Sequence, residues 1–167
     1  EGGRESPHAD WFDIDWEPAE PSLHGKILLP VLGDHYGAIL ERGELSLRYD
    51  AELGGFSIRY YEHAFPVRPH DYGDILRRGM SAGHAEDNEL ALVMAGADSL
   101  RAGDRETGGV LGRRRTANVV KRRLSELLAQ STEARAIVAA AEDAYTGDPT
   151  RPSSFDDLDA LIDRQSY

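Results

Sequence analysis

The chain has 167 residues, of which 40% are hydrophobic and 29% are charged. This composition is typical of a globular protein long enough to bury a hydrophobic core, and it argues against a disordered, collagen-like or coiled-coil chain. Acidic residues outnumber basic ones by 30 to 19, and the resulting net charge of −11 at pH 7 disfavours nucleic acid and anionic membranes as partners.

The sequence contains no cysteine, which excludes disulfides, thiolate metal sites and a cysteine nucleophile. No apolar run reaches the length of about 18 residues that a membrane-spanning helix needs. The first residues lack the apolar segment of a signal peptide, so we expect a cytoplasmic protein. The six histidines never recur at helical spacing and no nucleotide-binding glycine motif occurs, so we expect neither a metal nor another cofactor.

Residues 1–69 are rich in aromatic residues, proline and glycine, and we expect them to form a subdomain of short strands and loops. Residues 12–16 alternate large apolar residues with aspartates, which predicts a half-buried strand. Residues 33–41 have the composition of a short helix or turn. Two further alternating segments, 44–49 and 56–61, flank a turn-rich stretch and predict a β-hairpin.

Residues 70–167 are predicted to form a helical subdomain. Apolar residues recur at helical spacing in 120–128, 134–145 and 155–162, so these segments predict three amphipathic helices. The segment 101–115 is rich in glycine and arginine and predicts an exposed loop. Strands followed by helices in this order predict the α+β fold class.

Two carboxylates stand two residues apart in the first predicted strand. Asp13 and Asp15 would lie on one face of it, with Cα atoms about 6.5–7 Å apart. This is near the spacing of carboxylate pairs that act on glycosidic bonds, and the rings of Trp11, Phe12 and Trp16 could stack on sugars. The alternative is a polar, solvent-facing side of an edge strand whose aromatic residues face the core.

The string Tyr60-Tyr61-Glu62-His63 follows the predicted hairpin. It combines aromatic rings, a carboxylate and an imidazole at a strand end, where ligand-binding groups often project. Packing of the tyrosines in the core explains the same pattern. The sequence therefore leaves a binding role and a structural role open for this segment.

A basic cluster formed by 113–115 and 121–123 leads into one of the predicted helices. It could bind phosphate or nucleic acid. The acidic balance of the chain and the absence of interleaved aromatic residues favour a solvated helix face instead.

Several strings along the chain resemble maltooligosyl trehalose synthases, in order and in spacing. They are Asp10-Trp11-Phe12-Asp13-Ile14-Asp15-Trp16-Glu17-Pro18, His24-Gly25-Lys26-Ile27-Leu28-Leu29-Pro30-Val31-Leu32-Gly33 with Tyr36-Gly37, Gly43-Glu44-Leu45, and Tyr60-Tyr61-Glu62-His63 with Phe65-Pro66. A C-terminal stretch is similar as well, with Ser154-Phe155-Asp156, Leu158, Leu161, Gln165 and Tyr167. The resemblance is strong over 10–66 and 153–167 and thin between 77 and 152.

The resemblance implies an α-amylase-superfamily enzyme with a (β/α)₈ barrel. Such an enzyme isomerises the reducing-end α-1,4 bond of a maltooligosaccharide to an α,α-1,1 bond in trehalose biosynthesis. The chain is similar to the insertion after the third barrel strand, and the family's catalytic carboxylates lie on later strands. The chain begins with Glu1 and ends just after an amphipathic stretch. We therefore expect an internal fragment without catalytic residues, whose partners are the rest of the barrel and a maltooligosaccharide.

An insertion of this kind could close the sugar pocket and exclude water. Because rings stack on sugars and carboxylates or imidazoles bind their hydroxyls, we expect some aromatic and polar residues of the first half to face substrate. The expected substrate-binding residues are Asp13, Asp15, Trp16, Tyr36, Tyr61 and His63. A stand-alone carbohydrate- or protein-binding module is the main alternative, and a nucleic-acid or regulatory partner of the basic cluster is a third.

Overall fold

The computed structural model describes residues 15–21, 24–26, 31–80, 88–101 and 109–165. Within these ranges it contains a three-stranded antiparallel sheet and six α-helices, which confirms the predicted α+β class. In chain order the elements are α1 (Tyr36–Glu41), β1 (Leu45–Asp50), β2 (Gly55–Tyr60), β3 (His63–Pro66), the 3₁₀ helix η4 (Pro69–Asp71), α2 (Tyr72–Met80), α3 (Asn88–Arg101), α4 (Gly109–Gln130), α5 (Thr132–Ala144), the 3₁₀ helix η5 (Pro152–Phe155) and α6 (Asp156–Asp163).

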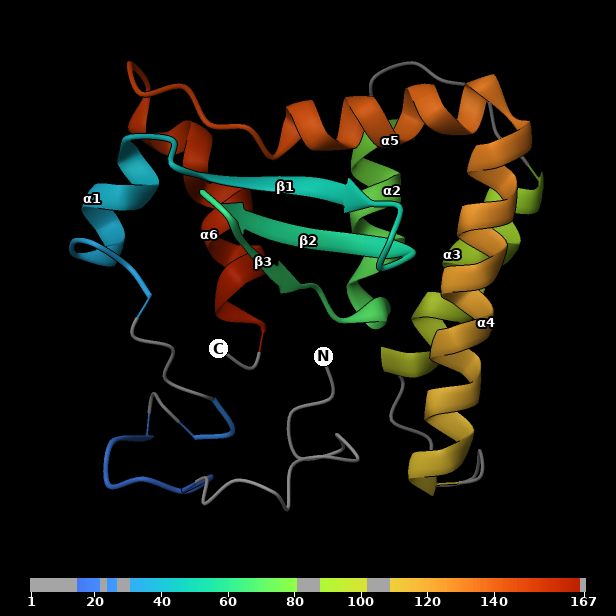
Figure 1. Ribbon diagram of the computed structural model, residues 1–167, viewed down its shortest axis with the longest axis horizontal. Coiled ribbons are helices and arrows are strands. Elements are labelled where there is room, and N and C mark those ends of the chain that lie inside the picture. The colour runs from blue at the N-terminus through green and yellow to red at the C-terminus, as the bar shows by residue number, and fades with distance from the viewer. Residues whose placement is uncertain (1–14, 22–23, 27–30, 81–87, 102–108, 166–167) are drawn as a thin grey trace.

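The helices are arranged around the small sheet, whose strand order is β1-β2-β3. In the view of Figure 1, α2 and α6 lie behind the strands, and α5 runs along the β1 side. Helices α3 and α4 form a pair beyond the turn that joins β1 to β2, whereas α1 lies at the opposite end of the sheet. The buried apolar side chains of the strands and of helices α1 to α6 belong to one hydrophobic cluster.

The predicted β-hairpin is confirmed as β1 and β2. In the observed register Leu47 pairs with Ile58, and both side chains are buried. The side chain of Asp50 fixes the connecting turn, because its carboxylate accepts hydrogen bonds from the backbone N–H of Leu53 at 3.1 Å and from the Arg59 guanidinium at 2.8 Å. An aspartate that accepts backbone N–H groups of the following residues favours a turn at this place.

A third strand, β3, extends the sheet beyond the predicted hairpin. It pairs with β2 from Tyr60 opposite His63 to Ser57 opposite Pro66, so a loop of only two residues joins the strands. All four residues of β3 are half-buried. They therefore lack the alternation of buried and exposed residues by which a strand is recognised in a sequence.

The β1 side of the sheet is closed by a side chain of α5. The carboxylate of Glu142 accepts a hydrogen bond from the backbone N–H of Tyr49 at 2.6 Å, and its second oxygen lies 3.7 Å from the guanidinium of Arg48. A backbone donor of the edge strand is thereby satisfied without another strand.

Helices α2 and α5 approach each other at a glycine. A Cβ atom built on the buried Gly79 would lie 2.2 Å from the carbonyl oxygen of Ile137 and 3.1 Å from the Cβ of Ala141. Ile75 and Leu76 of α2 are fully buried beside this contact. The small residues on both helices therefore set the distance between the two backbones.

The three predicted amphipathic helices are confirmed as parts of α4, α5 and α6, and the short helix expected in 33–41 is α1. The loop predicted for 101–115 was wrong at both ends: Arg101 is the last residue of α3, and residues 109–115 form the first turns of α4. Arginine is a good helix former, and it outweighs the glycines that suggested a loop. Residues 102–108 lie outside the described part of the chain.

Asp15 and Trp16, the last two residues of the strand predicted for 12–16, do not form a strand. Asp15 and Trp16 belong to an irregular segment. The Asp15 carboxylate accepts the backbone N–H of Glu17 at 3.0 Å, and the Trp16 carbonyl accepts the N–H of Gly25 at 2.9 Å. Such local bonds favour turns over a sheet ladder. Residues 12–14 lie outside the described part.

Across the described ranges, no helix is both long and apolar enough to cross a membrane.

Candidate functional site

Four neighbouring side chains form an aromatic group where β2 turns into β3. We name Tyr60, Tyr61, His63 and Phe65 the aromatic corner. The rings of Tyr60 and Tyr61 meet edge to face with centroids 4.8 Å apart. The His63 ring stacks between Tyr60 at 6.5 Å and Phe65 at 6.1 Å. These contacts hold flat apolar surfaces side by side at one end of the sheet.

Tyr61 is the exposed member of the aromatic corner. It occupies the two-residue loop with a φ of +49° and is 71% exposed. For a residue other than glycine this backbone conformation costs about 1 kcal/mol, and glycine or asparagine normally occupies it. A large aromatic residue at such a position points to a function for its side chain rather than for the turn.

Charged side chains lie directly beside the corner. The Tyr61 hydroxyl donates to a Glu44 carboxylate oxygen at 3.3 Å. Arg42 binds the other Glu44 oxygen and also donates to Asp34 at 3.0 Å. The negative charge of Glu44 raises the pKa of Tyr61 and so favours the protonated form of this phenol. The aromatic corner and the charged side chains bonded to it thus offer rings, carboxylates and a guanidinium close together.

The segment before α1 reaches the same end of the sheet. The backbone N–H of Gly33 donates to the Tyr60 hydroxyl at 3.0 Å. Figure 1 shows α1 beside the end of the sheet where β3 begins. Gly33 and Tyr60, which belong to two of the strings that carry the family resemblance, are therefore in contact.

Tyr36, the first residue of α1, is tied to α6. Its hydroxyl donates to the Asp159 carboxylate at 2.7 Å. Partial burial, together with this bond, raises the pKa of Tyr36 well above its usual range. Lys26 forms a second contact with α6, an ion pair with Asp163 at 2.8 Å. Tyr36 consequently anchors α1, and its phenol is already engaged by a carboxylate.

The other predicted substrate-binding residues are placed differently. Asp15 is exposed, and one of its carboxylate oxygens is used by the local turn at Glu17. Trp16 is half-buried in the same segment. Asp13 lies outside the described residues. The structure therefore brings Tyr61 and His63 together in the aromatic corner, while Tyr36 and Asp15 make polar contacts elsewhere.

A second polar cluster, which sequence analysis did not find, surrounds a buried carboxylate at the start of α2. We name it the Asp71 cluster. The Asp71 side chain is only 1% exposed, yet it accepts hydrogen bonds from Gln165 at 3.0 Å, from Arg101 at 3.2 Å and from Arg164 at 3.3 Å, and His70 lies 3.3 Å away. Buried Gln165 also accepts the backbone N–H of Arg68 at 2.9 Å. The cluster thus joins η4, α3 and the end of α6.

The environment of Asp71 favours its charged form. Burial acts to raise the pKa of this carboxyl, but hydrogen bonds from His70 and Gln165 and the nearby Arg164 charge outweigh it and lower the pKa. The side chains of Gln165, Arg101 and Arg164 all donate hydrogen bonds to the carboxylate. Such a fully satisfied network is characteristic of a structural tie.

The described residues contain no group of three or more His, Asp or Glu side chains placed to hold a metal ion. The polar side chains beside the aromatic corner provide a hydrogen-bond acceptor in Glu44 and a donor in Arg42.

The fold and the corner together define an α+β protein that carries an aromatic, carboxylate-bearing surface next to an edge strand. Comparison with known proteins adds no relative: no family model, no curated protein and no solved structure matches the chain.

Proposed function

We propose that the chain is part of a (1→4)-α-D-glucan 1-α-D-glucosylmutase and that its aromatic corner forms a wall of the sugar pocket. The observation that carries this proposal is Tyr61, a 71% exposed ring held in an unfavourable backbone conformation. The resemblance of the surrounding residues to maltooligosyl trehalose synthases supplies the reaction. The barrel of the parent enzyme and the reacting carboxylates belong, in this proposal, to segments outside the chain.

The chemistry gives such a wall a defined task. A retaining glycosidase forms a glycosyl-enzyme intermediate that water hydrolyses. For isomerisation, the released glucose must stay in the pocket, turn, and present its anomeric hydroxyl before water reaches the intermediate. Groups that hold the glucose and exclude water favour transfer over hydrolysis.

The corner has the groups for this task. The Tyr61 ring can stack on the apolar face of a glucose unit, and the half-buried His63 ring continues that surface towards Phe65. Glu44 and Arg42 can accept from and donate to sugar hydroxyls. Asp15, Trp16 and Tyr36, which lie outside the aromatic corner, and Asp13, which lies outside the described residues, remain proposed substrate-facing residues.

Replacing Tyr61 with glycine separates binding from folding. We expect the Tyr61→Gly chain to lose most of its affinity for maltopentaose, because the stacking ring is gone. Its free energy of unfolding should change by less than about 1 kcal/mol, since glycine relieves the backbone cost at φ +49°. Isothermal titration calorimetry and urea unfolding measure the two effects.

Leu53→Gly is the matched control, because Leu53 is also a large exposed residue in a turn, the one between β1 and β2. It should leave maltopentaose affinity unchanged. Equal affinities of Tyr61→Gly and the unmodified chain for maltopentaose would show that the aromatic corner does not bind the sugar.

The reaction itself is tested in the complete protein that contains this chain. We expect His63→Ala to raise the ratio of hydrolysis to isomerisation of maltopentaose, because a smaller side chain admits water and holds the glucose less well. Products are separated by chromatography and assayed for reducing ends. A complete protein that forms no non-reducing product would refute the mutase and leave a carbohydrate- or protein-binding module. An unchanged ratio in a stably folded variant would give His63 a structural role.

A further inference from the structure

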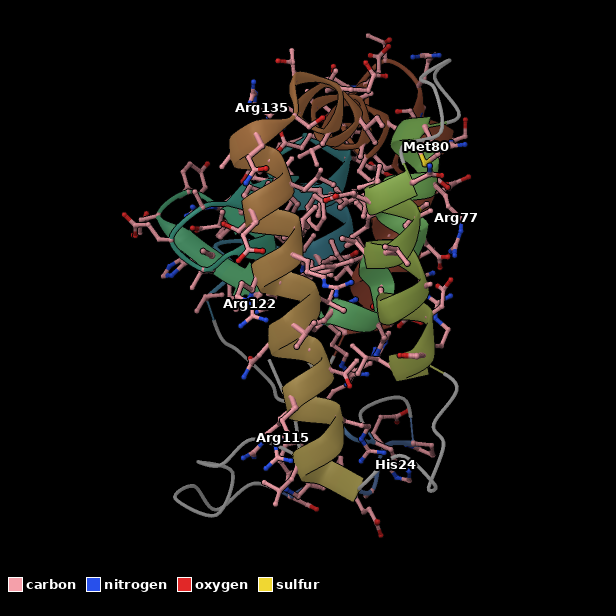
Figure 2. All side chains as sticks on the ribbon, turned by 90° about the vertical axis from the view of Figure 1, so that its right-hand side faces the viewer. His24, Arg77, Met80, Arg115, Arg122 and Arg135 are labelled. Carbon is pink, nitrogen blue, oxygen red and sulfur yellow. The ribbon has the colours of Figure 1, made fainter. Side chains whose placement is uncertain are left out.

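The outer face of α4 carries an exposed stripe in which apolar and cationic residues alternate. Leu111, Arg115, Val119 and Arg122 follow at intervals of four, four and three residues, which places them on one side of the helix. We name them the α4 stripe. Leu111 is 66% and Val119 39% exposed, and Arg115 and Arg122 are exposed as well. In Figure 2, Arg115 and Arg122 lie one above the other along α4.

The stripe lies opposite the side of α4 that packs into the protein. Val120, Leu124 and Leu127 are buried, and at about 100° per residue they lie about 120–180° around the helix from Arg115 and Arg122. The two arginines of the α4 stripe therefore lie away from the core, and Val119 lies at its border. Exposed leucine and valine on a helix that already has a complete buried face suggest a second contact surface.

The charge of this surface is opposite to that of the chain. Helix α4 contains six basic residues and one acidic residue, Glu126, while the whole chain has a net charge of −11. Among the described residues, Arg115 has no ion-pair partner, and the Arg122 guanidinium has only Glu126 at 3.8 Å. An exposed pair at that distance contributes little and leaves the guanidinium accessible.

We infer that the α4 stripe docks an acidic amphipathic helix of another protein. Two guanidinium groups about 10 Å apart along the axis fit carboxylates two turns apart on such a helix, and Leu111 and Val119 fit its apolar residues. Nucleic acid matches the stripe less well, because a phosphodiester backbone offers nothing to the two apolar side chains, and the acidic remainder of the chain repels it.

A second copy of the chain is also a poor match through its acidic helix. In α6, acidic residues occupy the exposed side, but Leu158 and Leu161 are fully buried in the protein's own core. Helix α6 therefore has the required charge without an available apolar face.

The inference is tested with a synthetic peptide of about 20 residues, a length at which helices become stable. Leucine and glutamate follow each other in turn at positions three or four residues apart, so that they share one face of the peptide helix. The peptide is titrated into the 167-residue chain at low and at physiological ionic strength. We expect binding that weakens with salt, and amide shifts in NMR spectra confined to α4 and its neighbours. Peptides with glutamine or lysine in place of glutamate should bind more weakly.

Variants locate the contact. Arg115→Gln combined with Arg122→Gln should lower affinity about fivefold, because two exposed ion pairs are lost. Arg48→Gln combined with Arg151→Gln removes the same charge from exposed arginines outside α4 and should change affinity less than twofold. Val119→Ser should lower affinity without altering its salt dependence.

Four results would overturn the inference: no binding of the acidic peptide, equal binding of the glutamine peptide, equal effects of the two double variants, or tighter binding of a single-stranded oligonucleotide than of the acidic peptide. Concentration-dependent self-association that the peptide fails to displace would assign the stripe to a second copy instead. Sugar binding at the aromatic corner is unaffected by each of these outcomes.

Discussion

Asp71→Ala is expected to destabilise the protein by about 3 kcal/mol and to lower its melting temperature by about 6–12 °C. The substitution removes the common acceptor of the Asp71 cluster. Buried Gln165 loses a hydrogen-bond partner and Arg164 loses its ion pair, while Arg101 loses one of two carboxylate partners and retains Asp74 at 2.7 Å. Since these residues belong to segments far apart in the sequence, contacts at the end of α3 and at the end of α6 are weakened together.

Asp98→Ala is the control for this prediction. Asp98 is a partly exposed carboxylate that pairs with Arg77 of the neighbouring helix, and its loss should cost less than about 1 kcal/mol. Thermal unfolding followed by circular dichroism compares the two variants. Equal melting temperatures would show that Asp71 does not hold these segments together.

Acid should remove the contribution of Asp71. Because the pKa of Asp71 is lowered in the folded protein, its charged form stabilises the fold at every pH above the ordinary aspartate pKa of about 3.9. This stability is lost as pH falls below that value and through the folded pKa. The stability difference between the unmodified chain and Asp71→Asn should therefore shrink below about pH 4. A constant difference would contradict the ionised state assigned to Asp71.

Gly79→Ala is expected to cost about 3 kcal/mol through a single added methyl group. The new Cβ would meet the Ile137 carbonyl oxygen at 2.2 Å, and a backbone atom of α5 cannot rotate away as a side chain could. The two helices must therefore move apart, which loosens the packing of Ile75 and Leu76 beneath them. Urea unfolding measures the loss as a lower midpoint with an unchanged slope.

The same substitution in α1 has the opposite expected sign. A Cβ on Gly37 would have nothing within 4 Å, so Gly37→Ala should stabilise the protein by about 0.5–1 kcal/mol through helix propensity alone. If Gly79→Ala were as stable as Gly37→Ala, the close approach of α2 and α5 would be wrong.

Local patterns predicted the elements whose two faces differ. The hairpin was recognised because Leu45 and Leu47 alternate with polar residues, and α5 because its apolar residues recur at helical spacing. Strand β3 has four half-buried residues, and α3 carries apolar residues on its exposed side, including Leu92. In such elements the contrast between faces, on which prediction depends, is weak.

The candidate site was predictable only where its residues lie close together in the sequence. Tyr61 and His63 lie two positions apart and were found together, whereas Glu44 joins them through the strand register, from 17 residues away. The Asp71 cluster connects residues 30 and 94 positions apart, and no local pattern marks a single aspartate as buried. The positive φ of Tyr61 was equally invisible, because that conformation is associated with glycine and asparagine.

The carboxylate of Glu142 on the edge of β1 has a consequence for behaviour at high concentration. An open strand edge can recruit an extended segment from another molecule and so begin fibril growth. At Tyr49 an incoming segment would find the backbone N–H already bound and would have to displace a negatively charged side chain held beside Arg48. Helix α5 thus protects this edge of the sheet from intermolecular strand addition.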